Sequence, residues 1–131
     1  FLKADLEEAQ VVSGEADPLD AARSLFALGP RLVCVTLGAE GAVYCCDAGV
    51  GHVAAPKVDA VDTTGAGDAF SATVLAGLLR HDLAAWGSLD RDDVAHLVRR
   101  ACVAGARVCR HPGATAGLPS SRDLDEAQAL R

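Results

Sequence analysis

Several features that would point directly to a function are missing from this sequence of 131 residues. It has no excess of basic residues, since 12 lysines and arginines face 18 acidic residues and the formal net charge is −6. A general binder of the nucleic-acid backbone needs a basic surface, so we expect no nucleic-acid partner. No apolar run approaches the roughly 20 residues of a membrane-spanning helix, so we expect no membrane partner either.

The cysteines and histidines lack the spacings that are typical of metal sites and disulfide frameworks. The five cysteines are odd in number and include no C-x-x-C pair, and the four histidines include no H-E-x-x-H. We therefore expect buried, reduced thiols of a cytoplasmic protein, and no metal held by histidine and cysteine.

Methionine is absent as well, and residue 1 is phenylalanine. We interpret the chain as part of a longer protein, with a further region upstream of Phe1. Half of the residues are hydrophobic, and a chain of this size can bury a sizeable core. We expect one folded unit over residues 1–131.

Apolar segments predict a small sheet. The near-continuous apolar run over residues 31–37 predicts a strand that is covered on both faces, as in an α/β protein. Residues 42–46 and 50–54, separated by glycine-containing turns, predict two further strands of an antiparallel meander. Residues 1–4 have the character of the end of another strand.

Helix signals lie on both sides of these strands. Asp5 and Asp17 are suited to cap helices, and Pro18 is suited to a first helical position. The third predicted helix is apolar almost all round, so we expect it to lie inside, against other layers. The predicted helices cover residues 5–13, 17–28, 66–80, 90–108 and 123–130, and their order among the strands predicts α/β layers.

The segment Val61–Phe70 carries the clearest chemical signal. Gly65 and Gly67 allow successive backbone N–H groups to converge, and the dipole of the following helix adds partial positive charge. Such a turn suits a phosphoryl group. Asp68 would repel that anion unless it served the attacking group. An ionised carboxylate could accept a hydroxyl proton as the oxygen bonds to phosphorus.

Two common nucleotide-binding patterns are absent from the sequence. The lysine of the G-x-x-x-x-G-K-[ST] loop is missing, and no G-x-G-x-x-G occurs. A P-loop and a dinucleotide site are therefore disfavoured.

Residues 62–68, Asp-Thr-Thr-Gly-Ala-Gly-Asp, resemble the D-T-x-G-A-G-D signature of the ribokinase-like (PfkB) carbohydrate kinases. Residues 5–8 resemble the family's N-x-x-E motif, with aspartate in place of asparagine. Residues 35–41 resemble its T-L-G-x-x-G turn, and residues 101–115 its C-terminal adenine and cation loop. The resemblance covers essentially the whole chain. It implies the C-terminal portion of a three-layer α/β/α sandwich, without the N-terminal half and the lid.

The resemblance implies ATP-dependent phosphorylation of a sugar hydroxyl, as in a fructokinase or a ribokinase. Asp68 would be the general base, and Gly65, Ala66 and Gly67 would form the anion hole. Cys102 would lie near the adenine. The residues implied for nucleotide binding are Asp5, Thr36, Leu37, Gly38, Ala39, Glu40, Gly41 and Cys102.

The resemblance also implies two cations. Glu8 would help to organise Mg²⁺ and phosphate through water, as this hard ion prefers. Asp5 and Glu8 have an alternative role as a helix cap and a first-turn charge. A monovalent cation, K⁺, would lie beside the anion hole, held mostly by backbone oxygens of Asp62, Thr64, Val108, His111, Gly113 and Gly117.

Two other functions remain open at this point. The same signature serves nucleoside kinases such as adenosine kinases, and a non-catalytic nucleotide-binding module could keep the turn without the chemistry. Because the N-terminal half supplies most sugar contacts in this family, the sugar stays unidentified and we expect the fragment to be inactive alone. A homodimer of the full-length protein is open as well.

Overall fold

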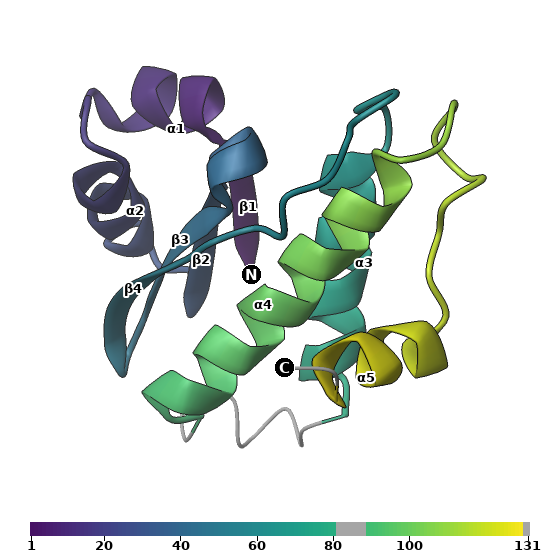
Figure 1. Cartoon of the computed structure of the whole chain (residues 1–131). Coiled ribbons are helices and arrows are strands. Elements are labelled where there is room, and N and C mark those ends of the chain that lie inside the picture. The colour runs from purple at the N-terminus through teal and green to yellow at the C-terminus, as the bar shows by residue number, and fades with distance from the viewer. Residues whose placement is uncertain (81–88, 130–131) are drawn as a thin grey trace.

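The computed structural model describes residues 1–80 and 89–129, which form a four-stranded sheet between two helical layers (Figure 1). Strand β1 pairs in parallel with β2, and β2, β3 and β4 form an antiparallel meander. The predicted α/β/α layering and the meander are therefore confirmed. The strands, in their order across the sheet, are β1 (Leu2–Asp5), β2 (Leu32–Thr36), β3 (Ala42–Cys46) and β4 (Gly49–Val53).

Strand β2 shows why the sheet is buried on both sides. Its side chains alternate between the two faces, as in any strand. Leu32 and Cys34 belong to the core on one face, whereas Val33 and Val35 belong to the core on the other. All four are buried, which explains the continuous apolar run in the sequence.

Helices α1 (Leu6–Ser13) and α2 (Pro18–Phe26) cover one face of the sheet. The Asp5 side chain accepts the N–H of Glu8, and the Asp17 side chain accepts the N–H groups of Leu19 and Asp20. Both predicted caps are thus confirmed, and they satisfy amides that the first helical turn leaves without a carbonyl partner.

Helices α3 (Ala66–Leu78) and α4 (Arg91–Val108) pack together on the other face, and α5 (Ser121–Ala129) packs against α4. Phe70, Val74 and Leu78 of α3 enter the same core as β2 and α4. A short 3-10 turn, η1 (Gly38–Glu40), links β2 to β3. The sequence placed the end of α3 two residues too late and the start of α5 two residues too late, and the predicted last residue, Leu130, lies outside the described part.

The expectation that α3 would lie inside, against other layers, holds for one side of the helix only. Leu75 is 44% exposed and Leu79, directly after the helix, is 71% exposed. The sheet and α4 contact only one side of α3, so its opposite side has no covering layer among the described residues. The helix is therefore apolar on both sides, but only one of these sides is covered by other elements.

The cysteines and the helix lengths can be described directly. The five cysteines are free thiols and four of them are buried. None of the helices in residues 1–80 and 89–129 is long and apolar enough to cross a bilayer.

We predict a large difference between two leucines near the end of α2. Leu25 is 2% exposed in the core beneath α2, whereas Leu28 is 71% exposed. Leu25→Ala should lower the free energy of unfolding by about 2–5 kcal/mol because it leaves a cavity. Leu28→Ala, which removes the same atoms, should change it by less than about 0.5 kcal/mol. Urea unfolding measures both, and equal effects would contradict the described packing.

Candidate active site

The turn that precedes α3 differs from the start of three other helices. Helices α1, α2 and α4 each begin with an aspartate cap whose side chain accepts amides of the first turn. The cap of α3 is Gly65, with φ of 82° and no side chain to accept those amides. A helix that begins in this way keeps its N-terminal amides available.

The hydrogen bonds of the described residues show which amides these are. No acceptor among them is bonded to the N–H groups of Gly65, Gly67 and Asp68. The N–H of Ala66 donates to the Thr63 carbonyl at 3.2 Å. Of the predicted anion hole, Gly65 and Gly67 therefore have open amides, whereas the amide of Ala66 is already engaged. The Asp68 amide, which the sequence did not suggest, is open too.

The Asp68 side chain is exposed in the first turn of α3. It makes no hydrogen bond or ion pair with the residues that the structure describes. A carboxylate at the surface, beside open amides and a helix N-terminus, can reach a bound molecule and accept a proton from it. A buried carboxylate with its neighbours' amides engaged could not do so.

Asp62 fixes the shape of this turn. One carboxylate oxygen accepts the Thr64 N–H at 2.9 Å, and the other accepts the Gly113 N–H at 2.8 Å. These hydrogen bonds, first those from Thr64 and then that from Gly113, lower the pKa of Asp62 from 3.8 to about 2. The charged carboxylate thus ties the turn before α3 to the loop after α4.

Two backbone contacts strengthen the same connection. The Cys109 carbonyl accepts the N–H groups of Val61 and Asp62, at 2.7 and 3.2 Å. At Gly65 a Cβ would lie 2.8 Å from the Ala114 carbonyl oxygen, so only glycine fits between the two segments. Residues 61–65 and 109–114 therefore form one packed unit.

Of the six residues predicted to hold a monovalent cation, Asp62, Thr64, His111 and Gly113 lie in this unit, and Val108 and Gly117 lie next to it. Asp62 contacts Thr64 and Gly113, as described. A Cβ on Gly117 would lie 2.8 Å from the His111 ring and 2.9 Å from the Val108 Cα, so these three residues are also adjacent. The Val108 carbonyl already accepts the His111 N–H at 3.0 Å, but a carbonyl oxygen has a second lone pair.

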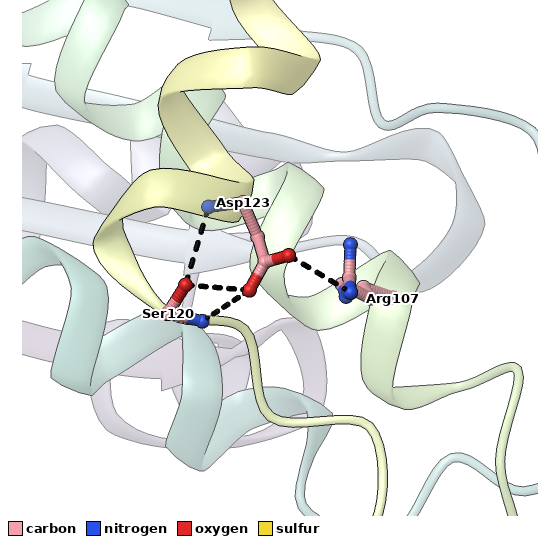
Figure 2. Close-up of polar contacts among 3 residues, drawn as sticks. All are labelled: Arg107, Ser120 and Asp123. Atoms are coloured by element: carbon pink, nitrogen blue, oxygen red, sulfur yellow. Dashed lines mark hydrogen bonds and ion pairs between the residues drawn. The ribbon is translucent and has the colours of Figure 1, made fainter.

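Figure 2 shows how the far end of this C-terminal loop is held. The Asp123 carboxylate accepts the N–H and the hydroxyl of Ser120, at 2.8 and 2.6 Å, and the guanidinium of Arg107 at 3.2 Å. The hydrogen bonds from Ser120 are the main cause that lowers the pKa of Asp123. Because Arg107 belongs to α4 and Asp123 to α5, the loop is anchored at both ends.

A cavity of about 480 Å³ opens beside the turn. Its walls come from the β2–β3 connection, the segment 55–63, the start of α3 and one side of α4. Of the residues predicted for nucleotide and anion binding, those that line it are Thr36, Gly38, Ala39, Gly41, Ala66, Gly67 and Cys102. Residues from four separate segments thus meet at one cavity.

Of the residues predicted to bind the nucleotide or Mg²⁺, Asp5, Glu8, Leu37 and Glu40 do not line this cavity. Leu37 packs against the core under α1 and α2, and the Glu40 carbonyl contacts the His52 ring at 2.9 Å. The N–H of Asp5 donates to the Glu8 carboxylate and the N–H of Glu8 to the Asp5 carboxylate, both at 2.8 Å. Asp5 and Glu8 therefore form a helix-capping box, which was the alternative role.

Cys102 and Gly41 contribute shape to the cavity. Burial raises the pKa of the Cys102 thiol to about 11, so it is a neutral packing group. Gly41 has φ of 101°, and a Cβ there would lie 2.0 Å from the Val53 carbonyl oxygen. The tight approach of the β2–β3 connection to the end of β4 requires this glycine.

Of the cavity wall that α4 forms, the sequence singled out only Cys102 as a nucleotide residue. Gly105 and Ala106 of α4, and Cys109 directly after it, line the cavity as well. A Cβ on Gly105 would lie only 3.2 Å from the Ala66 carbonyl oxygen, so α4 approaches the turn closely. The small residues Cys102, Gly105, Ala106 and Cys109, which recur at helical spacing, could have indicated this wall from the sequence.

The described residues contain no cluster of three or more histidine, cysteine, aspartate or glutamate side chains that could hold a metal ion. The side chains of residues 1–80 and 89–129 therefore do not enclose a metal ion with three such ligands. Mg²⁺ commonly binds through one or two carboxylates together with substrate phosphates, so a single glutamate such as Glu8 is compatible with Mg²⁺ held mainly by a nucleotide.

Comparisons with known proteins show which family the sequence matches. A family model described as pfkB family carbohydrate kinase matches residues 1–121. A probable chloroplastic fructokinase-6 of Arabidopsis thaliana is 38% identical over 129 residues, which cover 97% of this chain and 33% of that protein. The aminoimidazole riboside kinase of Salmonella typhimurium is 37% identical over 123 residues, covering 94% and 37%. The chain thus spans about a third of the length of these curated relatives.

Solved structures show the same fold. A fructokinase double mutant from Vibrio cholerae, in a form with fructose, ADP and potassium ion bound, superposes with a TM-score of 0.79 at 28% identity. The match covers 95% of this chain and 39% of that one. The aminoimidazole riboside kinase of Salmonella enterica, complexed with aminoimidazole riboside and an ATP analogue, gives 0.78 at 34% identity, covering 95% and 41%.

We predict that the bond between Asp62 and Gly113 resists acid. Because folding lowers the pKa of Asp62, its contribution is complete above the ordinary value of 3.8 and is lost as the pH falls through about 2. The Gly113 amide resonance should therefore stay constant from about pH 6 to pH 4 and move only below about pH 3. NMR of ¹⁵N-labelled protein measures this.

A matched pair of variants controls that experiment. Asp62→Asn, which keeps only one acceptor oxygen, should speed hydrogen exchange at Thr64 or Gly113. Asp59→Asn, at an exposed position three residues earlier, should leave both amides unchanged. A Gly113 resonance that moves already between about pH 5 and pH 4 would show that the two groups are not bonded.

Proposed function

The chain belongs to the pfkB family of carbohydrate kinases, and from this premise we propose that residues 1–131 are the ATP-binding and catalytic C-terminal part of a single kinase domain. The proposed reaction transfers the γ-phosphate of ATP to a sugar hydroxyl. One observation carries the proposal: the exposed Asp68 lies next to open amides at a glycine-capped helix, beside a cavity of about 480 Å³.

Asp68 is the general base in this proposal. Its carboxylate accepts the proton of the acceptor hydroxyl while a bond forms between that oxygen and the γ-phosphorus. The bond from the γ-phosphorus to the oxygen of ADP breaks in the same step. The open amides of Gly65 and Gly67, together with that of Asp68, offset the negative charge on the transferred group.

The nucleotide lies in the cavity in this proposal. Thr36, Gly38 and Gly41 border it on one side, and Cys102 borders the adenine. ADP and an ATP analogue are bound in the two related structures named above, which supports this role. The neutral Cys102 thiol supplies packing there and takes no part in chemistry.

Two cations complete the proposed site. K⁺ is assigned in this proposal to the backbone oxygens of Asp62, Thr64, Val108, His111, Gly113 and Gly117, and the related fructokinase structure, which contains potassium ion, supports this role. Mg²⁺ would neutralise phosphate charge and would be held mainly by the nucleotide, with Glu8 acting through water. Glu8 would then keep its bond to the Asp5 N–H.

The acceptor is the least constrained part of the proposal. Fructose is bound in one related structure and aminoimidazole riboside in another, and both proteins resemble this chain to a similar degree. A sugar of the fructose or ribose type is the proposed acceptor, and a riboside, as for a nucleoside kinase, is the second candidate. ATP consumption by the full-length protein, measured with pentoses, hexoses and nucleosides, decides between them. Binding of ATP without consumption for any acceptor would indicate a non-catalytic module.

We predict that Asp68→Asn lowers turnover of the full-length protein by about 10²–10⁴-fold because the proton acceptor is lost. ATP affinity should stay within about threefold, since the amides and the cavity are unchanged. Steady-state kinetics and ATP titration measure the two quantities. Asp59→Asn removes an exposed carboxylate of the same size and should have little effect on either. Turnover that survives Asp68→Asn would exclude Asp68 as the base.

A further inference from the structure

Both lysines of the chain lie at the candidate site. The sequence contains 12 basic residues, of which only Lys3 and Lys57 are lysines. All the ion pairs of the described residues use arginine, so neither lysine has a carboxylate partner there. Two unpaired ammonium groups at one site of an acidic protein call for a ligand of opposite charge.

Lys3 of β1 reaches the turn before α3. It lies in β1 opposite Cys34 of β2, whose side chain belongs to the core shared with α3 and α4. Its Nζ lies 3.2 Å, and its Cε 3.6 Å, from the position that a Cβ on Gly67 would occupy. The ammonium is therefore next to the residue that offers an open amide and lines the cavity.

Lys57 approaches the same cavity from another wall. It lies in the segment between β4 and α3, and it is the only residue with a charged side chain among the described residues that line the cavity. The rest of the lining is apolar, glycine or threonine. An exposed lysine with a flexible stem can bring its ammonium to a ligand inside while the stem rests on apolar surface.

The negative charges at the site explain why binding of a nucleotide would need the two lysines. A nucleotide polyphosphate is strongly anionic, and the turn that would bind it contains the carboxylates of Asp62 and Asp68. Open amides and a helix dipole supply only partial positive charge. Without further cations the two carboxylates would oppose the phosphates that the amides attract.

We propose that the two lysines share the polyphosphate of the nucleotide: Lys3 contacts the transferred phosphoryl group, and Lys57 contacts the part that is not transferred. This inference rests on the proposed kinase function. Lys3 lies beside the amide that stabilises the transferred group, so its effect is on the chemical step. Lys57 lies on the cavity wall, so its effect is on nucleotide binding. Lys3 is thereby a catalytic residue and Lys57 a binding residue.

The test uses the variants Lys3→Met and Lys57→Met of the full-length protein, because methionine keeps the apolar stem and removes the charge. Lys3→Met should lower kcat about 10²-fold and change the Kd for ATP less than about threefold. Lys57→Met should raise the Kd for ATP and ADP about tenfold and leave kcat at saturating ATP within about threefold. Lys3→Arg and Lys57→Arg should restore part of each loss.

Arg23→Met is the matched control. It removes one positive charge from α2, on the face of the sheet that is remote from α3, where Arg23 pairs with Asp20 at the surface. Lysine variants that match Arg23→Met in both kcat and Kd would overturn the inference. A reversed pattern, with Lys3 affecting only Kd and Lys57 only kcat, would overturn the assignment of the two roles.

Failure of the proposed function gives a different result. If the unmodified full-length protein neither binds nor consumes ATP, the kinase proposal fails before any variant is compared, and the lysine inference fails with it. If the unmodified protein phosphorylates an acceptor while both lysine variants behave as the control does, only the lysine inference is overturned.

Discussion

The double hydrogen bond of the Asp62 carboxylate is the interaction on which the candidate site depends. It joins the turn before α3 to the loop after α4, which are some fifty residues apart in the sequence: Asp62 and Gly113 are separated by 51 positions. Because Asp62 holds the turn from outside the helix, the start of α3 needs no capping side chain of its own. Gly65 can then occupy the cap position, and the amides that a capping side chain would have accepted remain open. Asp62 thus supports the turn, and Gly65 leaves the amides free for an anion.

Small residues determine how closely the surrounding segments approach. Gly105 lets α4 come near the Ala66 carbonyl, Gly65 lets the C-terminal loop come near the turn, and Gly41 lets the β2–β3 connection reach the end of β4. At Gly65 and Gly41 the backbone also has positive φ, which disfavours side chains regardless of space. These contacts build the walls of one cavity from segments that share no local sequence relation. Glycine allows these backbone segments to approach closely because it has no Cβ that would clash with the neighbouring atoms.

The electrostatics of the site combine partial and full charges. The open amides have fixed directions and supply partial positive charge at the position of the proposed transferred group. The lysines supply full charges on flexible stems, and they act where a net charge of −6 would otherwise disfavour an anionic substrate. Arginines, in contrast, form the ion pairs that hold the outer elements together, such as Arg107 with Asp123 (Figure 2). The two kinds of basic residue therefore serve different parts of the molecule.

Local chemistry in the sequence determined the elements and the candidate turn. Aspartate caps, a proline at a first helical position, two-sided apolar strands and the Asp62–Asp68 signature depend on neighbours within a few residues. They predicted the α/β layers and marked Asp68 as the candidate base. Tertiary structure alone decided the remainder. It packed Leu37 against the core, left one side of α3 exposed, and brought Lys3 of β1 beside Gly67. Each of these outcomes depends on which segment lies opposite, and the segment opposite is chosen by packing across the whole chain, which local spacing does not record.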